Sequence, residues 1–327
     1  MKALAPRRPP CSPAPQRGAA LLMAMIIVTL IATLAVSMVW QQWRAVQVET
    51  AERARQQSAW MLSGALDWSR IILKEDAKSG GADHLGEPWA VPLEEARLST
   101  FLAADKDNTE DAPDAFLSGA ITDLQARFNL TNLVDGGKIS EPDLLALRRL
   151  CETVNVAVTV ADNLAKGLLA ATPAAAGASA PGASANPPLL PRRFDQLGWL
   201  GIEPAALARL EPYVTLLPIR TPVNANTAPK EVLAAVIPNL DLGSAERLVQ
   251  VRQRTPFKTP TDIQSQLPAT TPQLNGQQVG VTTSFFEVRG RLRLADQVLE
   301  QRSVVERRGT SVTPLSRERV SSLDTRN

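Results

Sequence analysis

The longest apolar stretch of the chain lies near its N-terminus. From Ala19 to Trp43 there are 25 consecutive residues without a charged side chain, and residues 19–39 are almost wholly apolar. At about 1.5 Å per residue, a helix of this length spans roughly 37 Å, enough to cross the hydrocarbon core of a bilayer. The pattern therefore predicts a transmembrane helix over residues 19–43, with Trp40 at the membrane interface.

The helical pattern continues beyond the apolar stretch. No glycine or proline interrupts the chain between Gly18 and Gly64, and apolar or small residues recur at spacings of three and four up to Ile72. We therefore expect one helix from about Ala20 to Leu73. Its first half would face lipid, and its second half would pack on an exported domain.

The remaining pattern predicts a small sheet interrupted by helices. Residues 74–89 are rich in glycine and proline and indicate a loop, and residues 120–130 alternate as a strand does. A hairpin is expected from residues 284–294 and 298–307, with the turn at 295–297. Helical patterns lie between the strands, at residues 141–151, 155–170, 204–210, 229–236 and 244–253.

This order predicts an α+β fold: a long N-terminal transmembrane helix and a small antiparallel sheet with a large inserted helical domain. We expect a first part of the sheet domain over residues 44–135, the helical insert over 136–280, and the closing hairpin over 281–308. Within the insert, residues 172–191 are rich in Ala, Pro, Gly and Ser, which predicts a mobile loop. The polar residues 309–327 predict a disordered tail.

Charge and composition narrow the function. The chain of 327 residues has 35 basic and 33 acidic side chains, a net charge of +2, which does not favour a general nucleic-acid binder. Four basic and no acidic residues occupy positions 1–18, so the N-terminus is expected in the cytoplasm and the rest after Trp43 outside it. With one histidine, His84, two cysteines and no nucleophile turn, neither an enzyme nor a cysteine-based metal site is expected.

The residues just before the apolar stretch carry a known pattern. Arg17-Gly18-Ala19 followed by Ala-Leu-Leu-Met resembles the leader junction of type IV pilins and type II secretion pseudopilins. The resemblance implies that residues 1–18 are a prepilin leader, that prepilin peptidase cuts between Gly18 and Ala19, and that Ala19 is then N-methylated. The alternative is a secretory signal peptide cut near Ser37, but its apolar region would be shorter, about 7–15 residues.

One departure from that pattern indicates which type of pseudopilin the chain resembles. Most members carry a glutamate at the fifth mature position, which is Met23 here. An apolar residue there resembles the K-type minor pseudopilins of type II secretion systems, the general secretion pathway protein K family. An unpaired carboxylate within the bilayer would be costly, which agrees with a subunit at the filament tip. The segments Phe128–Leu133 and Thr221–Ala228 resemble the F-N-L-N-N-L and V-N-x-N-T-A motifs of the same family.

The resemblance implies a non-enzymatic role in protein secretion. The protein would be a single-pass inner-membrane subunit with a periplasmic C-terminal domain, and would form the tip or initiator of the pseudopilus that helps export folded proteins. The implied partners are minor pseudopilins of the I and J types, other pseudopilins, prepilin peptidase and the inner-membrane secretion platform. A minor type IV pilin is a nearby alternative.

Two further segments suggest other ligands. Residues 223–262 resemble a helix-hairpin-helix module, so a membrane-anchored DNA receptor is a second alternative, although both hairpin glycines are missing and Asp241 disfavours phosphate. The acidic segment from Asp105 lacks the glycine and glutamate of an EF-hand loop, so a solvated loop is favoured over a calcium site. Its candidate calcium ligands are Asp105, Asp107, Glu110 and Asp111. No other cofactor is expected.

Overall fold

The computed structural model describes residues 17–98, 115–172, 188–294 and 297–320. The chain divides into two compact units, Met1–Ala59 and Trp60–Asn327. The candidate calcium ligands at 105–111 and most of the predicted mobile loop lie outside the described residues, as do residues 1–16 of the predicted leader. These predictions, like the domain boundaries, remain predictions.

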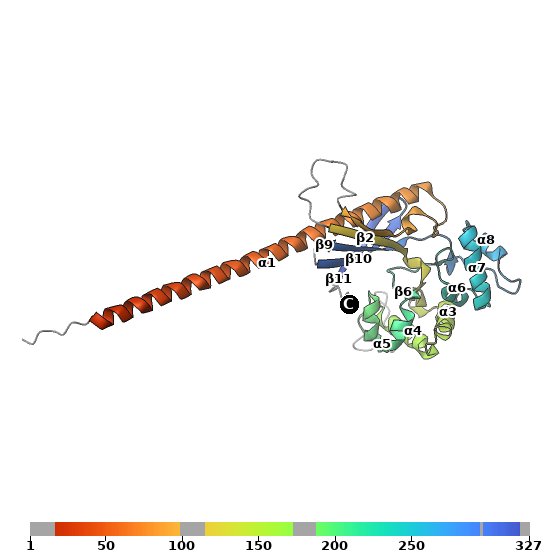
Figure 1. Cartoon of the computed structure of the whole chain (residues 1–327). Helices are drawn as coiled ribbons and strands as arrows, with labels where there is room; N and C mark the ends of the chain where they lie inside the picture. The colour runs from red at the N-terminus through yellow and green to blue at the C-terminus, as the bar shows by residue number, and fades with distance from the viewer. Residues whose placement is uncertain (1–16, 99–114, 173–187, 295–296, 321–327) are drawn as a thin grey trace, which may run out of the picture. The chain divides into compact units, whose positions relative to one another are not determined.

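One long helix, α1, extends over Arg17–Ser79 (Figure 1). The predicted helix is confirmed and continues six residues further, so the loop expected over 74–89 begins only at Gly80. Lys78 in the last turn and the positive φ of Gly80 (66°) suit a helix end, because basic side chains and a left-handed residue both complement the terminal carbonyls.

The second unit contains a five-stranded antiparallel sheet of order β1-β2-β9-β10-β11. Its strands are β1 (Leu93–Arg97), β2 (Ala115–Asp123), β9 (Phe285–Leu294), β10 (Gln297–Arg308) and β11 (Ser311–Val320). The predicted C-terminal hairpin is confirmed as β9 and β10. Four two-residue and three-residue elements flank these strands: η1 (Pro88–Ala90), η2 (Leu124–Ala126), β3 (Phe128–Asn129) and β4 (Val134–Asp135).

The C-terminal half of α1 packs on one face of this sheet. Leu66 and Leu73 are buried against Phe286 and Val288 of β9, whose side chains alternate toward the helix as a strand requires. The same face continues with Leu62 against Leu292. Burial of an apolar face by one helix is what holds the helix on the sheet.

Helices between the strands share a separate hydrophobic cluster, which includes Leu147, Leu164, Leu210 and Leu233. They are α3 (Glu141–Thr153), α4 (Val158–Ala171), α5 (Pro204–Leu210), α6 (Lys230–Val236), α7 (Leu242–Arg254) and α8 (Pro260–Ser265). The remaining short elements are η3 (Leu130–Leu133), β5 (Lys138–Ile139), η4 (Phe194–Leu200), β6 (Val214–Thr215), β7 (Val223–Asn224) and β8 (Val279–Gly280). Figure 1 shows the helices gathered in one group.

Two expectations from the sequence were wrong, and two elements were not predicted. The strand expected over 120–130 is β2, which starts at Ala115 and ends at Asp123, because the Asp123 side chain accepts the Gln125 N–H and turns the chain into η2. The predicted disordered tail forms β11 over Ser311–Val320, paired with β10. The edge strand β1 and the short helix α8 were not predicted.

Candidate functional site: the N-terminal helix and the buried motif residues

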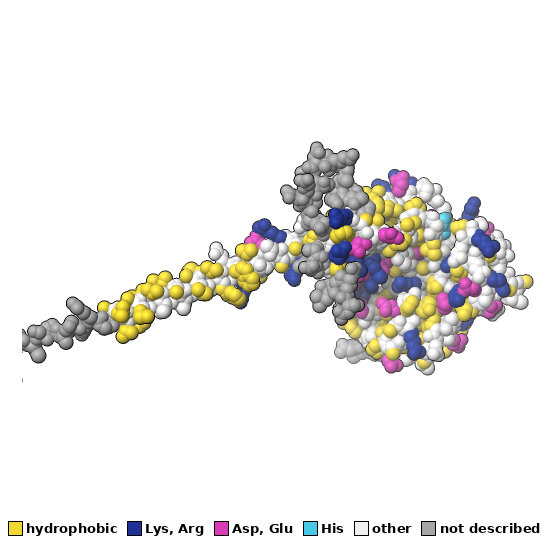
Figure 2. All heavy atoms as spheres, viewed as in Figure 1, with side chains coloured by type: hydrophobic (Ala, Val, Ile, Leu, Met, Phe, Trp, Pro, Cys, Tyr) yellow, Lys and Arg dark blue, Asp and Glu magenta, His cyan; other side chains and the backbone are white. Residues whose placement is uncertain are grey.

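The N-terminal part of α1 is apolar and exposed. Within the described residues it is the one helix long and apolar enough to cross a membrane, with a mean hydropathy of 2.7 over its most apolar 18 residues, none of them buried. Figure 2 shows hydrophobic side chains covering this part of the helix, with charged side chains only further along. The hydroxyls of Thr29 and Thr33 donate to the carbonyls of Ile26 (2.9 Å) and Leu30 (2.8 Å). A lipid-facing helix must satisfy its polar groups internally in this way.

The predicted processing residues lie at the start of this helix. Arg17 opens α1 and Ala19 is exposed. Met23, at the position where the resemblance expects a glutamate, is 64 % exposed and therefore available to a neighbouring subunit. Cleavage, methylation and the role of Met23 remain predictions. At the other end of the apolar stretch, the rings of Trp40 and Trp43 lie 5.5 Å apart.

The first family-like motif, Phe128–Leu133, contains two buried asparagines that form hydrogen bonds with a distant segment. The Asn129 amide donates to the Ile219 carbonyl at 2.8 Å and accepts the Leu217 N–H at 3.1 Å. Asn132 exchanges two hydrogen bonds with the backbone of Thr221, at 2.8 and 3.0 Å. Each asparagine side chain thus both donates to and accepts from the backbone, as a neighbouring strand would. The segment that it holds lies 88–90 residues away in the sequence.

The second motif forms a connected polar network. Asn226 exchanges hydrogen bonds with the Phe257 backbone at 2.8 and 2.9 Å, which fixes the end of α7. Asn224 and Thr227 donate to one oxygen of the Asp123 carboxylate, at 2.9 and 2.6 Å. The other oxygen accepts from the Thr283 hydroxyl at 2.6 Å and from the Gln125 N–H at 2.7 Å.

Asp123, at the end of β2, therefore links the sheet to the segment at β7 and to the segment just before β9. Burial raises the pKa of its carboxyl, and the four hydrogen bonds oppose that effect. The asparagines of both motifs thus hold distant segments of the fold together. Sequence reasoning missed Asp123 and Thr283, because their partners lie 101 to 160 residues away and neither residue belongs to a recognised motif.

A second acidic group lies at the C-terminal end of α1. Carboxylate oxygens of Asp76, Asp83 and Glu87 fall within 4.8 Å of one another, the spacing of a metal site. Arg307 already occupies this group, since it bonds to Asp76 at 2.6 Å and also to Asp83. Glu87 accepts from the Trp89 indole at 2.7 Å.

Burial is the main cause that raises the pKa of both Asp76 and Glu87. With an arginine supplying the positive charge, the group serves as an internal clamp between α1 and β10. The nearby His84 uses its Nδ1 to accept the Gly86 N–H at 3.1 Å.

The hairpin that resembles a DNA-binding module is closed by a carboxylate. Asp241 caps α7, because its side chain accepts the Ser244 N–H and hydroxyl, both at 2.8 Å. These hydrogen bonds hold the pKa of Asp241 below its usual value. The helix N-terminus, where such modules bind phosphate, thus carries a negative charge instead. The arrangement suits packing of α6 against α7.

Comparison with known proteins decides the family. The family described as type II secretion system (T2SS), protein K, matches residues 126–219 and 223–283, which contain the two asparagine motifs. Proteins named type II secretion system protein K are similar along most of their length. The one from Pseudomonas aeruginosa is 28 % identical over 86 % of each chain, and the one from Pectobacterium carotovorum subsp. carotovorum is 27 % identical over 93 % of this chain and 96 % of that one. Along most of its length, the chain is thus similar to type II secretion system protein K.

Other members and a solved structure agree with this assignment. The protein K of Klebsiella pneumoniae is 29 % identical over 90 % of this chain and 93 % of its own. A chain in the crystal structure of the GspK-GspI-GspJ complex from the enterotoxigenic Escherichia coli type 2 secretion system matches with a TM-score of 0.61 at 18 % identity. It covers 83 % of this chain and 99 % of that chain. The α+β fold and the family expected from the leader junction and motifs are confirmed.

Proposed function

We propose that this protein is a minor pseudopilin that forms or initiates the tip of the type II secretion pseudopilus. The single observation that carries the proposal is the joint occurrence of an exposed apolar helix, Ala19–Trp43, and the protein K motifs of the second unit. The role is mechanical: α1 anchors and assembles, and the sheet with its inserted helices forms a bulky head. The protein would act without catalysis and without a required cofactor.

The partners follow from the family. A solved complex joins GspK to GspI and GspJ, so we expect this chain to assemble with minor pseudopilins of the I and J types. Contact with the other pseudopilins and the inner-membrane platform would follow once this trio forms the filament tip. Met23 supports the tip position, because a subunit with no neighbour above it has no N-terminal amine for a glutamate to neutralise.

The location follows from charge and hydropathy. Lys2, Arg7, Arg8 and Arg17 precede the apolar stretch, so the N-terminus would stay in the cytoplasm and the second unit would lie in the periplasm. Prepilin peptidase would remove residues 1–18 and leave an N-methylated Ala19. Mass spectrometry of the mature N-terminus, with and without the peptidase, tests this step. An uncleaved leader, or a cut near Ser37, would contradict it.

The function itself is tested by complementation. A strain lacking its own protein K gene should regain secretion of a folded reporter enzyme when this gene is supplied. A variant with Gly18→Ala serves as control, since it leaves α1 and the head intact while blocking the leader cleavage. Failure of the wild-type gene in the strain from which it derives would refute the proposed role.

A further inference from the structure

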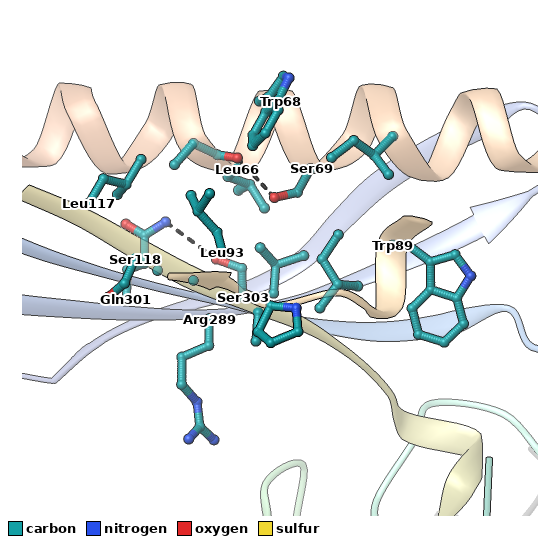
Figure 3. A pocket seen from close by; sticks show the side chains of 18 of the residues that line it. Leu66, Trp68, Ser69, Trp89, Leu93, Leu117, Ser118, Arg289, Gln301 and Ser303 are labelled. Atoms are coloured by element: carbon teal, nitrogen blue, oxygen red, sulfur yellow. Dashed lines mark hydrogen bonds between the residues drawn. The ribbon is translucent and has the colours of Figure 1, made fainter. Parts of the chain in front are cut away.

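A cavity lies between α1 and the sheet, on the side of β1. Its volume is about 250 Å³, and its walls are mainly apolar, including Leu66, Ile72, Ile121 and Val288. Figure 3 shows the helix above the cavity and the strands below it. Trp68 and Val91, which also line the cavity, are exposed to solvent and form its rim.

Two paired glycines form part of the cavity wall. Gly119 of β2 and Gly290 of β9 face each other in the register, and both line the cavity. A Cβ on Gly119 would lie 2.8 Å from the Arg289 carbonyl oxygen, so the close approach of the β9 backbone requires glycine there. A Cβ on Gly290 would lie 3.2 Å from a side-chain carbon of Leu62, a tight contact that this side chain would have to relieve. Neither glycine contributes a side chain to the cavity wall.

Two buried polar side chains on β10 also line the cavity. Gln301 is 6 % exposed and Ser303 is 1 % exposed, although their neighbours on this face are apolar. The Gln301 amide donates to the Ser303 hydroxyl at 3.3 Å. Within residues 17–98, 115–172, 188–294 and 297–320 the Gln301 side chain has no other hydrogen bond, and its carbonyl oxygen accepts none. The oxygen is not sealed from solvent, so it is an acceptor left open at the cavity wall.

The exposed residues at the rim of the cavity indicate what kind of ligand would cover them. Val91 is 68 % exposed and Trp68 is 47 % exposed, and Ile71, one turn from Trp68 on the same helix surface, is 61 % exposed. A free molecule of 250 Å³ would fill the cavity and leave this rim in water. A polypeptide that inserts one side chain would also cover the rim and the edge strand β1, which among the described strands pairs only with β2.

We infer that this cavity is a socket for one tyrosine or tryptophan side chain of a partner pseudopilin. A cavity of about 150 Å³ takes a benzene ring, so the larger space here suits a phenol or indole. Those side chains combine an apolar ring with one O–H or N–H donor, which matches apolar walls and the open Gln301 carbonyl oxygen. The inference rests on the proposed function, because that function supplies the partner.

Photo-crosslinking tests the socket in the assembled state. The full chain carries p-benzoylphenylalanine at Val91 and is co-expressed with the I- and J-type subunits in membranes. We expect an adduct with one of these subunits, mapped by mass spectrometry to a peptide that contains tyrosine or tryptophan. The same label at Leu315, which is 45 % exposed on β11, is the matched control and should give no such adduct.

Two variants in the labelled chain separate the socket from the rim. Ser303→Leu fills the cavity with an apolar group, and Gln301→Leu removes the amide at nearly constant volume. Each should lower the adduct yield about tenfold or more, as removal of a central anchor does. Thr313→Leu, on exposed β11, should leave the yield unchanged. Thermal unfolding of each variant checks that a loss does not come from misfolding, since overpacking a buried position can itself destabilise the fold.

The outcomes are distinct. An adduct that persists in both Ser303→Leu and Gln301→Leu would overturn the socket, as would an adduct only with lipid, with the same chain, or with a peptide lacking both aromatic residues. In those cases the unlabelled chain would still co-isolate with the I- and J-type subunits, and the proposed function would stand. Absence of co-isolation for the unlabelled chain would instead refute the proposed function and the socket together.

Discussion

Asp123 offers the sharpest test of how the sheet and the helices are joined. Its carboxylate accepts four hydrogen bonds, from Gln125, Asn224, Thr227 and Thr283, at 2.6 to 2.9 Å, and its side chain is buried. Asp123→Ala removes the acceptor of all four donors. Asn224 and Thr227 belong to the segment at β7, and Thr283 precedes β9. Losing these hydrogen bonds therefore weakens the junction between the sheet and the inserted helices.

The expected cost follows from the donors left without a partner. A hydrogen bond to a charged group contributes about 1.5–3 kcal/mol, and a buried unsatisfied donor costs about 1–3 kcal/mol. The favourable removal of a desolvated carboxylate offsets part of this sum. We therefore expect Asp123→Ala to lower the free energy of unfolding by about 3–5 kcal/mol, the larger part of it from the donors left unsatisfied.

Asp123→Asn should cost less, because its carbonyl oxygen keeps one pair of donors, while its amide faces the other pair. Urea unfolding of the full chain in detergent micelles, followed by tryptophan fluorescence, measures both variants. Asp67→Ala is the matched control: Asp67 is an exposed carboxylate paired with Arg70, and its loss should cost less than about 1 kcal/mol. A cost for Asp123→Ala no larger than that of the control would refute the reasoning.

Three further predictions concern the helix packing, the acidic clamp and the tip. Leu66→Ala, in the buried face of α1, should cost about 2–5 kcal/mol in unfolding free energy, against less than about 0.5 kcal/mol for exposed Ile71→Ala; equal costs would contradict the packing. Burial raises the pKa of Glu87, so the folded chain binds that proton more tightly; its stabilising effect is complete below the unfolded pKa of about 4.3 and is lost as pH rises through the folded value. Glu87→Gln should therefore reduce the fall of Tm with rising pH in that window, and an unchanged slope would refute the assignment. Met23→Glu should impair secretion and isolation of the I- and J-type subunits with the chain; if both stay normal, Met23 no longer supports the tip position.

Local patterns predicted the elements that depend on local chemistry. Helix α1 followed from a run without glycine or proline, and the β9–β10 hairpin followed from strict alternation around a short turn. Helix α5 has the bounds that the sequence indicated, since Pro204 opens it.

Elements that depend on distant partners could not be read in the same way. Strand β11 contains Pro314, Arg317 and Arg319, which resemble a polar tail, and it forms a strand because β10 pairs with it across Gly309. Charges and proline are common on such edge strands, because they prevent further pairing. Periodicity could not locate this strand.

The residues of the candidate site fall into the same two groups: some can be identified from the local sequence, and others only from the fold. Gly18, Ala19 and Met23 can be named from sequence because their meaning lies in a contiguous junction. The roles of Asn129 and Asn224 can be recognised only in the fold, where the side chain of each forms a hydrogen bond with the backbone of a distant segment. The cavity over Gly119 and Gly290 left no sequence signal at all, because its walls come from α1, η1, β1, β2, β9 and β10.

Co-isolation tests the central claim most directly. The full chain, tagged at its C-terminus, is co-expressed with the I- and J-type minor pseudopilins and prepilin peptidase, and complexes are isolated from solubilised membranes. The account predicts a complex that contains all three subunits, with this chain beginning at N-methylated Ala19. A complex of the I- and J-type subunits that forms without this chain, while this chain is isolated alone, would contradict it.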